Sequence, residues 1–391
     1  MNSQQESPSG PRSGRAKAAA PLQRLAELGQ SVWIDYLSRE LLESGGLARL
    51  VRDYAVVGVT SNPTIFQQAI SQGDAYDEQL RALLPSGLGA KEAFLELACA
   101  DVAAACDLLR PVWEQTGGRD GYVSIEVDPN LAYDTLAQHD EATRLHMTIA
   151  RRNLLVKIPA TRPGLTAIED AIADGRSINV TLVFSVERYV AVARAYLAGL
   201  ERFRAGGGDV STVRSVASFF VSRIDTETDR RLDALGAPAE LKGKLGIANA
   251  KLAYERFRQL FSTHDERWAA LAAAGAHPQR CLWASTSTKN PAYRDVRYVE
   301  ELIGPDTVDT MPKPTLLAFQ DHGAVAPTLE RGLDDAHRLL ERLEAVGVDY
   351  DDVVETLEAE GVEKFAGSVS QLYAELDAKR QTLLAAPGKP R

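Results

Sequence analysis

The sequence has few cysteines, and their spacing argues against a disulfide framework or a zinc site. Three of the 391 residues are cysteine, Cys99, Cys106 and Cys281, and no C-x-x-C pair occurs. The odd number and the mostly apolar neighbours predict reduced, buried thiols and favour a cytoplasmic protein. Cys99 and Cys106 lie seven residues apart in a predicted helix, so we interpret them as core residues rather than metal ligands.

Long apolar segments and glycine-rich phosphate-binding motifs are also missing. No apolar run is long enough to span a membrane, and the N-terminus has no apolar signal core, so we expect neither insertion nor export. Neither G-x-G-x-x-G nor G-x-x-x-x-G-K-[ST] occurs. His139 and His146 are two helical turns apart, which suits surface or packing residues better than a metal site. We therefore expect no bound metal.

Acidic residues outnumber basic ones. The sequence has 54 Asp and Glu against 44 Lys and Arg, a formal net charge of −10. Nucleic acids and anionic membranes bind clustered Lys and Arg, so this balance argues against both as partners. It leaves room for a small anionic substrate in a locally basic pocket.

The first part of the chain differs in composition from the rest. Residues 1–20 are rich in Ser, Gly, Pro and Gln and lack large apolar side chains, which predicts a disordered N-terminal tail. No linker divides the remainder of the chain, so we expect a single domain over residues 21–391. The long helical patterns after the last predicted strand are interpreted as helices added to that domain; a separate interaction module is the alternative.

Short apolar runs alternate with segments of helical periodicity from Ser31 onward. The runs are SVWIDYL, AVVGVTSN, GYVSIEVD, NLLVKIPA, SINVTLVFS, VRSVASFFVSRI, RCLWAST and TVDTMP. Strand–helix alternation predicts parallel strands covered by helices, and eight strands predict an α/β fold of the closed (β/α)8 or TIM-barrel type with additional helices. The alternative is an open doubly wound sheet, which usually carries a glycine-rich turn after its first strand; VWIDYLSRE has no glycine there.

Polar residues share one parity along several predicted strands. Because side chains alternate between the two faces of a strand, LLVKIP places Leu155 and Lys157 on the barrel interior. Leu154, Val156 and Ile158 then face outward. The same rule groups the polar residues Asp35, Asn62, Glu126, Lys157, Asn179 and Thr181. We predict that they line one interior near the carboxyl ends of the strands, where the active sites of such barrels lie.

Each of these residues also has a purely structural explanation. An Asp or Asn at a strand end is commonly a turn former or a helix cap, and Glu126 would suit a solvated edge. Lys157 would suit a structural ion pair, because buried charges are normally paired. The shared parity on independent strands favours a site, since a set of buried polar groups is costly unless its members serve one another or a ligand.

An amine enclosed by apolar walls loses part of its preference for the charged form, and a neutral amine attacks a sugar carbonyl to form a Schiff base. The resulting iminium is an electron sink that permits cleavage of the carbon–carbon bond two atoms away. One carboxylate must accept the hydroxyl proton of the cleaved fragment, and a second group must move protons during dehydration. Asp35 and Glu126 suit these two tasks.

With these residues assembled, the sequence resembles the transaldolase family, and in particular a longer-chain branch of it. The similar segments, within residues 25–325, are GVTSNPTIF, VSIEVDPN, LLVKIPAT, INVTLVFS and SFFVSRID, in the family's order. The resemblance implies that Lys157 is the Schiff-base lysine and that Asp35 acts on the cleaved hydroxyl. It further implies that Glu126 and Thr181 act on a catalytic water, and that Asn62 and Asn179 bind substrate hydroxyls.

The resemblance also implies a reaction of the pentose phosphate pathway. A dihydroxyacetone unit passes from sedoheptulose 7-phosphate to glyceraldehyde 3-phosphate, which gives erythrose 4-phosphate and fructose 6-phosphate. No cofactor is expected, because the iminium serves as the electron sink. The expected partners are sugar phosphates, and the expected assembly is a monomer or a homodimer.

The phosphate end of the substrate requires cations. Ser218 and Arg223 match family positions for substrate and phosphate binding, and the alternative for Arg223 is an ion pair with Asp225 or Glu227. In WASTSTKNP, Ser285 matches the family's serine, while Ser287 stands where many members have arginine. We expect Lys289 to supply the second cation.

Two other functions are compatible with this pattern. A fructose-6-phosphate aldolase-like enzyme would use the same lysine to release free dihydroxyacetone. A non-catalytic sugar-phosphate-binding barrel would have no need of Lys157.

Overall fold

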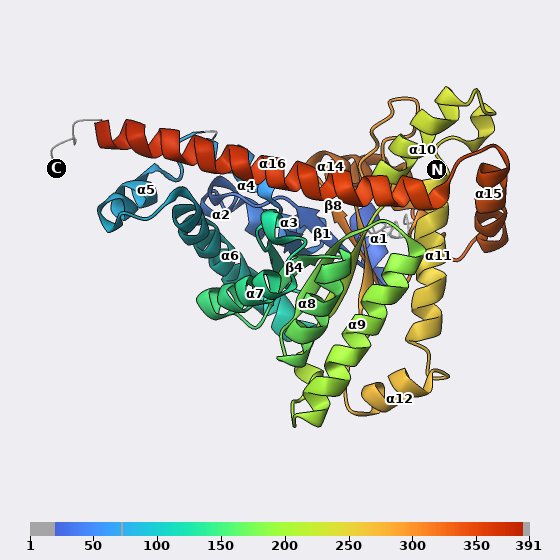
Figure 1. The fold of residues 1–391 in the computed structure, drawn as a ribbon, viewed down its shortest axis with the longest axis horizontal. Helices are drawn as coiled ribbons and strands as arrows, with labels where there is room; N and C mark the ends of the chain where they lie inside the picture. Colours follow the sequence, from blue (N-terminus) through green and yellow to red (C-terminus); the bar gives the residue numbers. More distant parts are fainter. Residues whose placement is uncertain (1–19, 72, 386–391) are drawn as a thin grey trace, which may run out of the picture.

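The computed structural model describes residues 20–71 and 73–385, and it confirms the closed barrel (Figure 1). Eight parallel strands pair in chain order, and the last pairs with the first. The strands are β1 (Gln30–Asp35), β2 (Val56–Thr60), β3 (Tyr122–Glu126), β4 (Leu154–Pro159), β5 (Ile178–Val183), β6 (Ser215–Phe220), β7 (Arg280–Ala284) and β8 (Thr307–Met311). The open-sheet alternative is therefore wrong.

Helices surround the barrel, and they outnumber the strands. They are α1 (Pro21–Glu27), α2 (Arg39–Glu43), α3 (Gly46–Tyr54), α4 (Pro63–Ser71), α5 (Asp77–Leu83), α6 (Ala90–Gln115), α7 (Thr135–Ile149), α8 (Arg162–Ala173), α9 (Val186–Ala205), α10 (Ser222–Ala234), α11 (Leu245–Leu260), α12 (Glu266–Ala273), α13 (Arg297–Glu301), α14 (Lys313–His322), α15 (Leu333–Ala345) and α16 (Tyr350–Ala385). The predicted additional helices are confirmed. In the part of the chain described, no helix combines the length and apolarity needed to cross a membrane.

Short capped turns link the strands to the helices that follow them. Thr161 accepts a hydrogen bond from the backbone nitrogen of Gly164 at the start of α8, and Ser185 accepts one from Arg188 at the start of α9. Each side-chain cap satisfies a backbone donor that the first helical turn leaves free. The strand ends before these caps are therefore held at defined positions.

Strand β4 shows why its lysine is buried. All six of its residues are buried, because one face lies against helices and the other faces the barrel interior. The ladder pairs Lys157 with Glu126 of β3 on one side and with Asn179 of β5 on the other. In a parallel ladder, partners at the same level point to the same face, so the register brings three polar side chains together.

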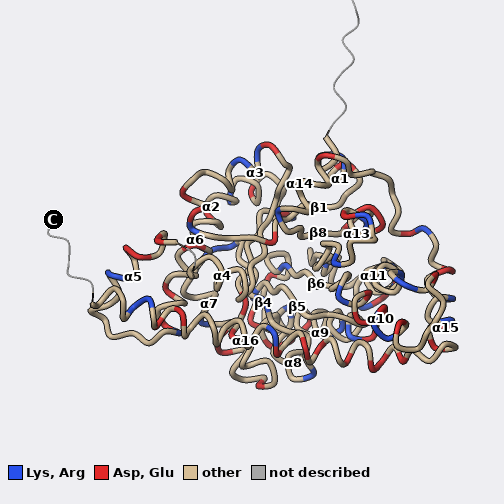
Figure 2. The backbone as a smooth tube through the Cα atoms, turned by 90° about the horizontal axis from the view of Figure 1, so that it is seen from above, with Lys and Arg blue, Asp and Glu red and all other residues tan. Residues whose placement is uncertain are grey.

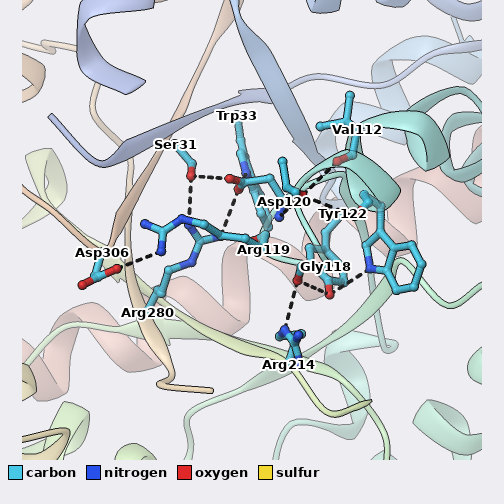
Figure 3. A network of polar contacts seen from close by, with 12 residues as sticks. Ser31, Trp33, Val112, Gly118, Arg119, Asp120, Tyr122, Arg214, Arg280 and Asp306 are labelled. Atoms are coloured by element: carbon cyan, nitrogen blue, oxygen red, sulfur yellow. Dashed lines mark hydrogen bonds and ion pairs between the residues drawn. The ribbon is translucent and has the colours of Figure 1, made fainter. Parts of the chain in front are cut away.

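The amino-terminal end of the barrel is closed by a buried polar network (Figure 3). The carboxylate of Asp120 accepts hydrogen bonds from Ser31 Oγ at 2.8 Å, Trp33 Nε1 at 3.3 Å and Arg280 Nη2 at 3.0 Å. Arg280 also donates to Ser31 Oγ at 2.8 Å. The Trp33 ring fills the interior opposite Gly58, where an added Cβ would lie 2.4 Å from the ring. A substrate must therefore enter from the other end.

The longest helix, α16, lies across the molecule at the carboxyl ends of the strands (Figure 1). Side-chain contacts tie it to elements from widely separated parts of the chain. Thr64 of α4 hydrogen-bonds Ser368 at 2.8 Å, and Arg188 of α9 pairs with Glu358 at 3.0 Å. These contacts hold the middle of α16 over the open end of the barrel.

Other expectations concern residues at the ends of the chain and isolated side chains. The predicted tail at residues 1–20 lies outside the described residues, apart from Ala20. All three cysteines are buried and unpaired, as predicted. His139 pairs with Asp174 at 2.8 Å, and His146 contacts the Ser177 carbonyl at 3.0 Å, so both have structural partners.

The network at the base generates a stability prediction. Replacing Asp120 with alanine leaves the buried Arg280 guanidinium without its carboxylate, so we expect the free energy of unfolding to fall by about 3–5 kcal/mol. The measurement is urea denaturation followed by circular dichroism.

The matched control is Asp306→Asn, which removes the charged partner of Arg119 in a half-exposed pair at 2.9 Å and keeps a residue type that tolerates the left-handed φ of 56° at this position. Exposed pairs contribute little, so this loss should stay below about 1 kcal/mol. Equal losses from the two substitutions would contradict the role given to the base network.

Candidate functional site

A cavity of about 590 Å³ opens at the carboxyl ends of the strands. Eight of the ten predicted site residues line it, namely Asp35, Asn62, Lys157, Thr181, Ser218, Arg223, Ser285 and Lys289. The other two, Glu126 and Asn179, do not line it and are buried behind its wall. Its volume falls in the range of about 300–1,000 Å³ that is typical of small-molecule sites.

Lys157 lies in the wall of this cavity and is 5% exposed. Its Nζ is 3.0 Å from Glu126 Oε2 and donates a hydrogen bond to the Ser61 carbonyl at 3.1 Å. The lysine therefore lies between a carboxylate on the neighbouring strand and the cavity. The pairing also provides the compensation that a buried charge requires.

Glu126 of β3 and Thr181 of β5 carry buried side-chain oxygens with different surroundings. Glu126 Oε2 has the Lys157 ammonium at 3.0 Å, whereas Thr181 Oγ1 has no hydrogen-bond partner within the described residues. Burial raises the pKa of the Glu126 carboxyl, and the nearby Lys157 opposes that shift. Just after Thr181, Leu182 takes a left-handed φ of 58° and the pairing of β5 with β6 shifts. Such local irregularities commonly re-aim side chains beside active sites.

Asp35 ends β1 on the same cavity. Its Oδ1 accepts a hydrogen bond from Thr60 Oγ1 at 2.7 Å, and Thr60 in turn contacts Thr310 Oγ1 at 2.7 Å. Burial raises the pKa of the Asp35 carboxyl, while Lys157 and the Thr60 hydrogen bond lower it. The ionised form is thus held by neighbours against a desolvating environment, which suits a group that exchanges a proton.

The two predicted amides have different surroundings. Asn62 lines the cavity, and its Oδ1 accepts a hydrogen bond from the backbone nitrogen of Ile65 at 3.1 Å, at the start of α4. Asn179 is fully buried; it donates to Ser124 Oγ at 3.1 Å and accepts from Ser218 Oγ at 2.7 Å. Asn179 therefore lies in the layer beneath the cavity, where it fixes Ser218.

Arg223 was expected at the end of the sixth strand, but it lies in the first turn of α10. Its guanidinium lies over the Phe220 and Phe365 rings, with centroid distances of 5.2 and 5.7 Å. The alternative of an ion pair with Asp225 or Glu227 is wrong. Asp225 accepts hydrogen bonds from Gly246 and Tyr298, and Glu227 pairs with two other arginines.

Cations gather at the outer part of the cavity. Arg223 and Lys289 were predicted there, and Lys313 of α14 and Lys364 of α16 lie with them. Within the described residues none of the four is paired with a carboxylate. Burial lowers the pKa of Lys289, and the nearby Arg223 charge lowers it further. For Lys364 the Arg223 charge is the larger cause of a lowered pKa, and burial adds to it. Cations that repel one another and have no carboxylate partner are stabilised by a bound anion, so this cluster is suited to bind a phosphate.

Residues that follow β7 also line this part of the cavity. Ser285 follows the strand with a left-handed φ of 56°, and its Oγ is 2.9 Å from Ser222 Oγ. Lys289 donates to Ser287 Oγ at 2.7 Å, so the two residues that differ from the common family pattern contact each other. No group of His, Cys, Asp and Glu within the described ranges has the arrangement of a metal site.

Sequence reasoning missed Lys313, Lys364 and Tyr36 as lining residues. Tyr36 follows Asp35 directly and carried no parity signal once the strand had ended. Lys364 lies on a C-terminal helix, far along the chain from every predicted site residue. Nothing in its local pattern indicates that α16 crosses the cavity.

Comparisons with known proteins identify the family of the chain. The family described as Transaldolase/Fructose-6-phosphate aldolase matches residues 32–376, which extends beyond the similar segments into α16. A transaldolase 2 from Streptomyces avermitilis is 50% identical over 370 residues, which cover 94% of this chain and 99% of that protein. A transaldolase from Thermobifida fusca is 52% identical over 369 residues, with coverage of 94% and 99%. One from Frankia alni is 53% identical over 355 residues, with coverage of 90% and 95%.

The surroundings of Asp35 generate a prediction about its titration. The Thr60 hydrogen bond favours the ionised carboxylate, so Thr60→Val should raise the pKa of Asp35 further and move its titration midpoint to higher pH. The measurement is a carbon-13 NMR titration of carboxyl-labelled aspartate, with the signal assigned by its loss in Asp35→Asn.

The control is Thr64→Val, which also changes a threonine of the cavity wall but one that bonds Ser368 instead. It should leave the midpoint in place. An unchanged or lower midpoint in Thr60→Val would show that the hydrogen bond does not stabilise the charge.

Proposed function

The chain belongs to the transaldolase/fructose-6-phosphate aldolase family and is a transaldolase, and on this premise we propose its substrates and mechanism. The proposed reaction transfers a dihydroxyacetone unit from sedoheptulose 7-phosphate to glyceraldehyde 3-phosphate through a Schiff base on Lys157. The observation that carries the proposal is the buried lysine in the cavity wall, with carboxylates beside it and unpaired cations further out.

The first half of the reaction forms the iminium. Glu126, whose pKa is raised by burial, takes a proton from Lys157 across their 3.0 Å contact, and the neutral amine attacks the ketose carbonyl. The carbinolamine then loses water. Glu126 and Thr181 hold the water that carries these protons, a role consistent with the buried Thr181 Oγ1, which has no hydrogen-bond partner within the described residues.

The second half breaks and remakes the carbon–carbon bond. Asp35 accepts the proton of the hydroxyl on the carbon that becomes an aldehyde, and the bonding electrons pass to the iminium to give an enamine. Erythrose 4-phosphate leaves, and the enamine attacks glyceraldehyde 3-phosphate while Asp35 returns the proton. Hydrolysis of the new iminium releases fructose 6-phosphate. Asn62 and Asn179 are assigned to substrate hydroxyls, Asn62 directly and Asn179 through Ser218, whose hydroxyl donates to it and which lines the cavity.

The phosphate of each substrate binds at the cation cluster. Arg223 offers a rigid fork of donors, and Lys289 and Lys364 add point charges from two other elements. Ser285 and Ser218 add neutral donors at the cavity wall. Lys157 lies within β4, whereas the cations lie in segments that follow the strands, so we assign the cluster to the end of the sugar opposite to the reacting carbonyl.

We also propose the setting in which the enzyme works. Three buried, unpaired thiols fit a reducing compartment, so the cytoplasm is the proposed location. The proposed assembly is a monomer or a homodimer. Residues 21–391 are proposed to form one domain, since α16 packs on elements from both halves of the barrel.

Trapping with borohydride tests the lysine and the aspartate together. With fructose 6-phosphate, the wild-type chain should gain a reduced adduct detectable by mass, and Lys157→Arg should gain none. Asp35→Asn should still form an adduct but lose about 10²–10⁴-fold in turnover, because it lacks the base for bond cleavage. An adduct on Lys157→Arg equal to that of the wild type, or near-normal turnover in Asp35→Asn, would reject these assignments.

The contribution of α16 is tested by Lys364→Gln. A charge-assisted hydrogen bond to phosphate contributes about 1.5–3 kcal/mol, and this lysine is exposed at the rim, so we expect kcat/KM to fall about tenfold through KM. The measurement is a steady-state assay of kcat and KM with fructose 6-phosphate as donor. The control is Glu363→Gln, an adjacent exposed residue that does not line the cavity. If both variants keep the wild-type KM, Lys364 does not bind the phosphate.

A further inference from the structure

A second cavity, of about 410 Å³, lies between α11 and α15 and shares no lining residue with the first. We call it the α11–α15 groove. Its basic lining residues are Lys244, Lys251, Arg297, Arg331, Arg338 and Arg342, and its acidic ones are Glu301 and Asp335. Figure 2 shows Lys and Arg positions beside α11 and α15. A basic hollow of this kind is unexpected on a chain with a net charge of −10.

Half of these cations already have a carboxylate partner. Arg338 pairs with Asp335 at 2.5 Å, Arg342 with Glu240 at 3.4 Å, and Lys251 with Glu301 at 3.3 Å. The other three are Lys244, Arg297 and Arg331. Within the described residues they have no carboxylate at ion-pair distance, so the groove carries an excess of positive charge.

Lys251 gives the groove a fixed internal cation. It is 8% exposed, and its Nζ donates to the Arg331 carbonyl at 3.1 Å in addition to the Glu301 contact. The bond ties α11 to the segment before α15 and so fixes the backbone that carries Arg331. A buried ammonium is costly unless it is compensated, and here its carboxylate partner is about half exposed.

The remaining surroundings suit a small ligand rather than a flat protein partner. The floor is formed by buried apolar residues, Ile247, Ala248, Ala336 and Leu339. Arg297 is held by stacking on the Tyr293 ring, with a centroid distance of 4.9 Å. The volume is that of a metabolite site, and fixed cations around an apolar floor match a compound that is anionic at one end.

We propose that the α11–α15 groove binds small metabolites that carry a diphosphate group. Lys244, Arg297 and Arg331 come from the starts of two helices and from a loop, so together they can surround a group with several anionic oxygens. A diphosphate matches their combined charge better than the single phosphate of a sugar monophosphate. Inorganic pyrophosphate and a nucleoside diphosphate share this chemistry, and the latter also has an apolar base for the floor.

Isothermal titration of the full chain with pyrophosphate and, separately, with ADP tests the proposal in phosphate-free buffer. We expect saturable binding with a dissociation constant of about 1 mM or lower. Tighter binding of ADP would identify the nucleoside diphosphate as the better ligand, and equal binding would assign the affinity to the diphosphate alone. No binding of either probe at about tenfold higher concentration would overturn the proposal.

Three double variants locate the binding. Lys244→Gln with Arg331→Gln should weaken it at least tenfold, while Arg338→Gln with Arg342→Gln removes the same charge from cations that are already paired and should weaken it less than threefold. Arg223→Gln with Lys364→Gln removes cations of the first cavity and should leave binding of the probe to the groove unchanged.

Equal weakening by the first two variants would mean nonspecific attraction, and complete loss of binding in the third would place the probe in the first cavity alone. Either result rejects the proposal that the α11–α15 groove binds a diphosphate. All the replaced side chains except Arg223 are exposed, and thermal melts without ligand verify that each variant is folded.

Discussion

The pairing of Lys157 with Glu126 is the constraint on which the site depends. The two residues are neighbours in the β3–β4 ladder, so their separation of 3.0 Å follows from strand register. A closed barrel buries both faces of every strand, and an inward lysine therefore has only barrel neighbours to compensate its charge. Glu126 supplies that compensation on one side, and the cavity leaves the other side of the amine open to a substrate.

The barrel contains two buried ion pairs whose surroundings differ in an informative way. At the base, Asp120 and Arg280 are saturated by Ser31, Trp33 and a backbone carbonyl, as expected of a pair that only holds strands together. Near the mouth, Glu126 Oε2 has the Lys157 ammonium as its close partner at 3.0 Å, and the lysine also lies in the wall of a cavity. A buried pair that borders a cavity is the arrangement expected where a group must bind or move protons.

The sequence predicted the parts of the site that depend on strand periodicity. Asp35, Lys157 and Thr181 line the cavity because alternation along a strand is rigid once both faces are covered. Depth along the strand was harder to predict. Asn179 shares the parity of Thr181 but lies one layer lower, among serines. The position of a residue that follows a strand was also harder to predict, because strand alternation ends there. Arg223, for example, lies in the first turn of α10 and not at the end of β6.

Local sequence patterns could not predict that Lys364 lines the cavity. The sequence of a helix indicates which of its faces is apolar, but not which end of the barrel the helix crosses. The same limit explains the α11–α15 groove, whose cations come from four separate segments. Net charge is equally uninformative at this scale. Screening in physiological salt reduces charge interactions beyond about 8 Å, so a ligand in either cavity responds to the few side chains around it. A chain with an overall negative charge can therefore hold anions at two places, provided that its fold gathers cations there and leaves them unpaired.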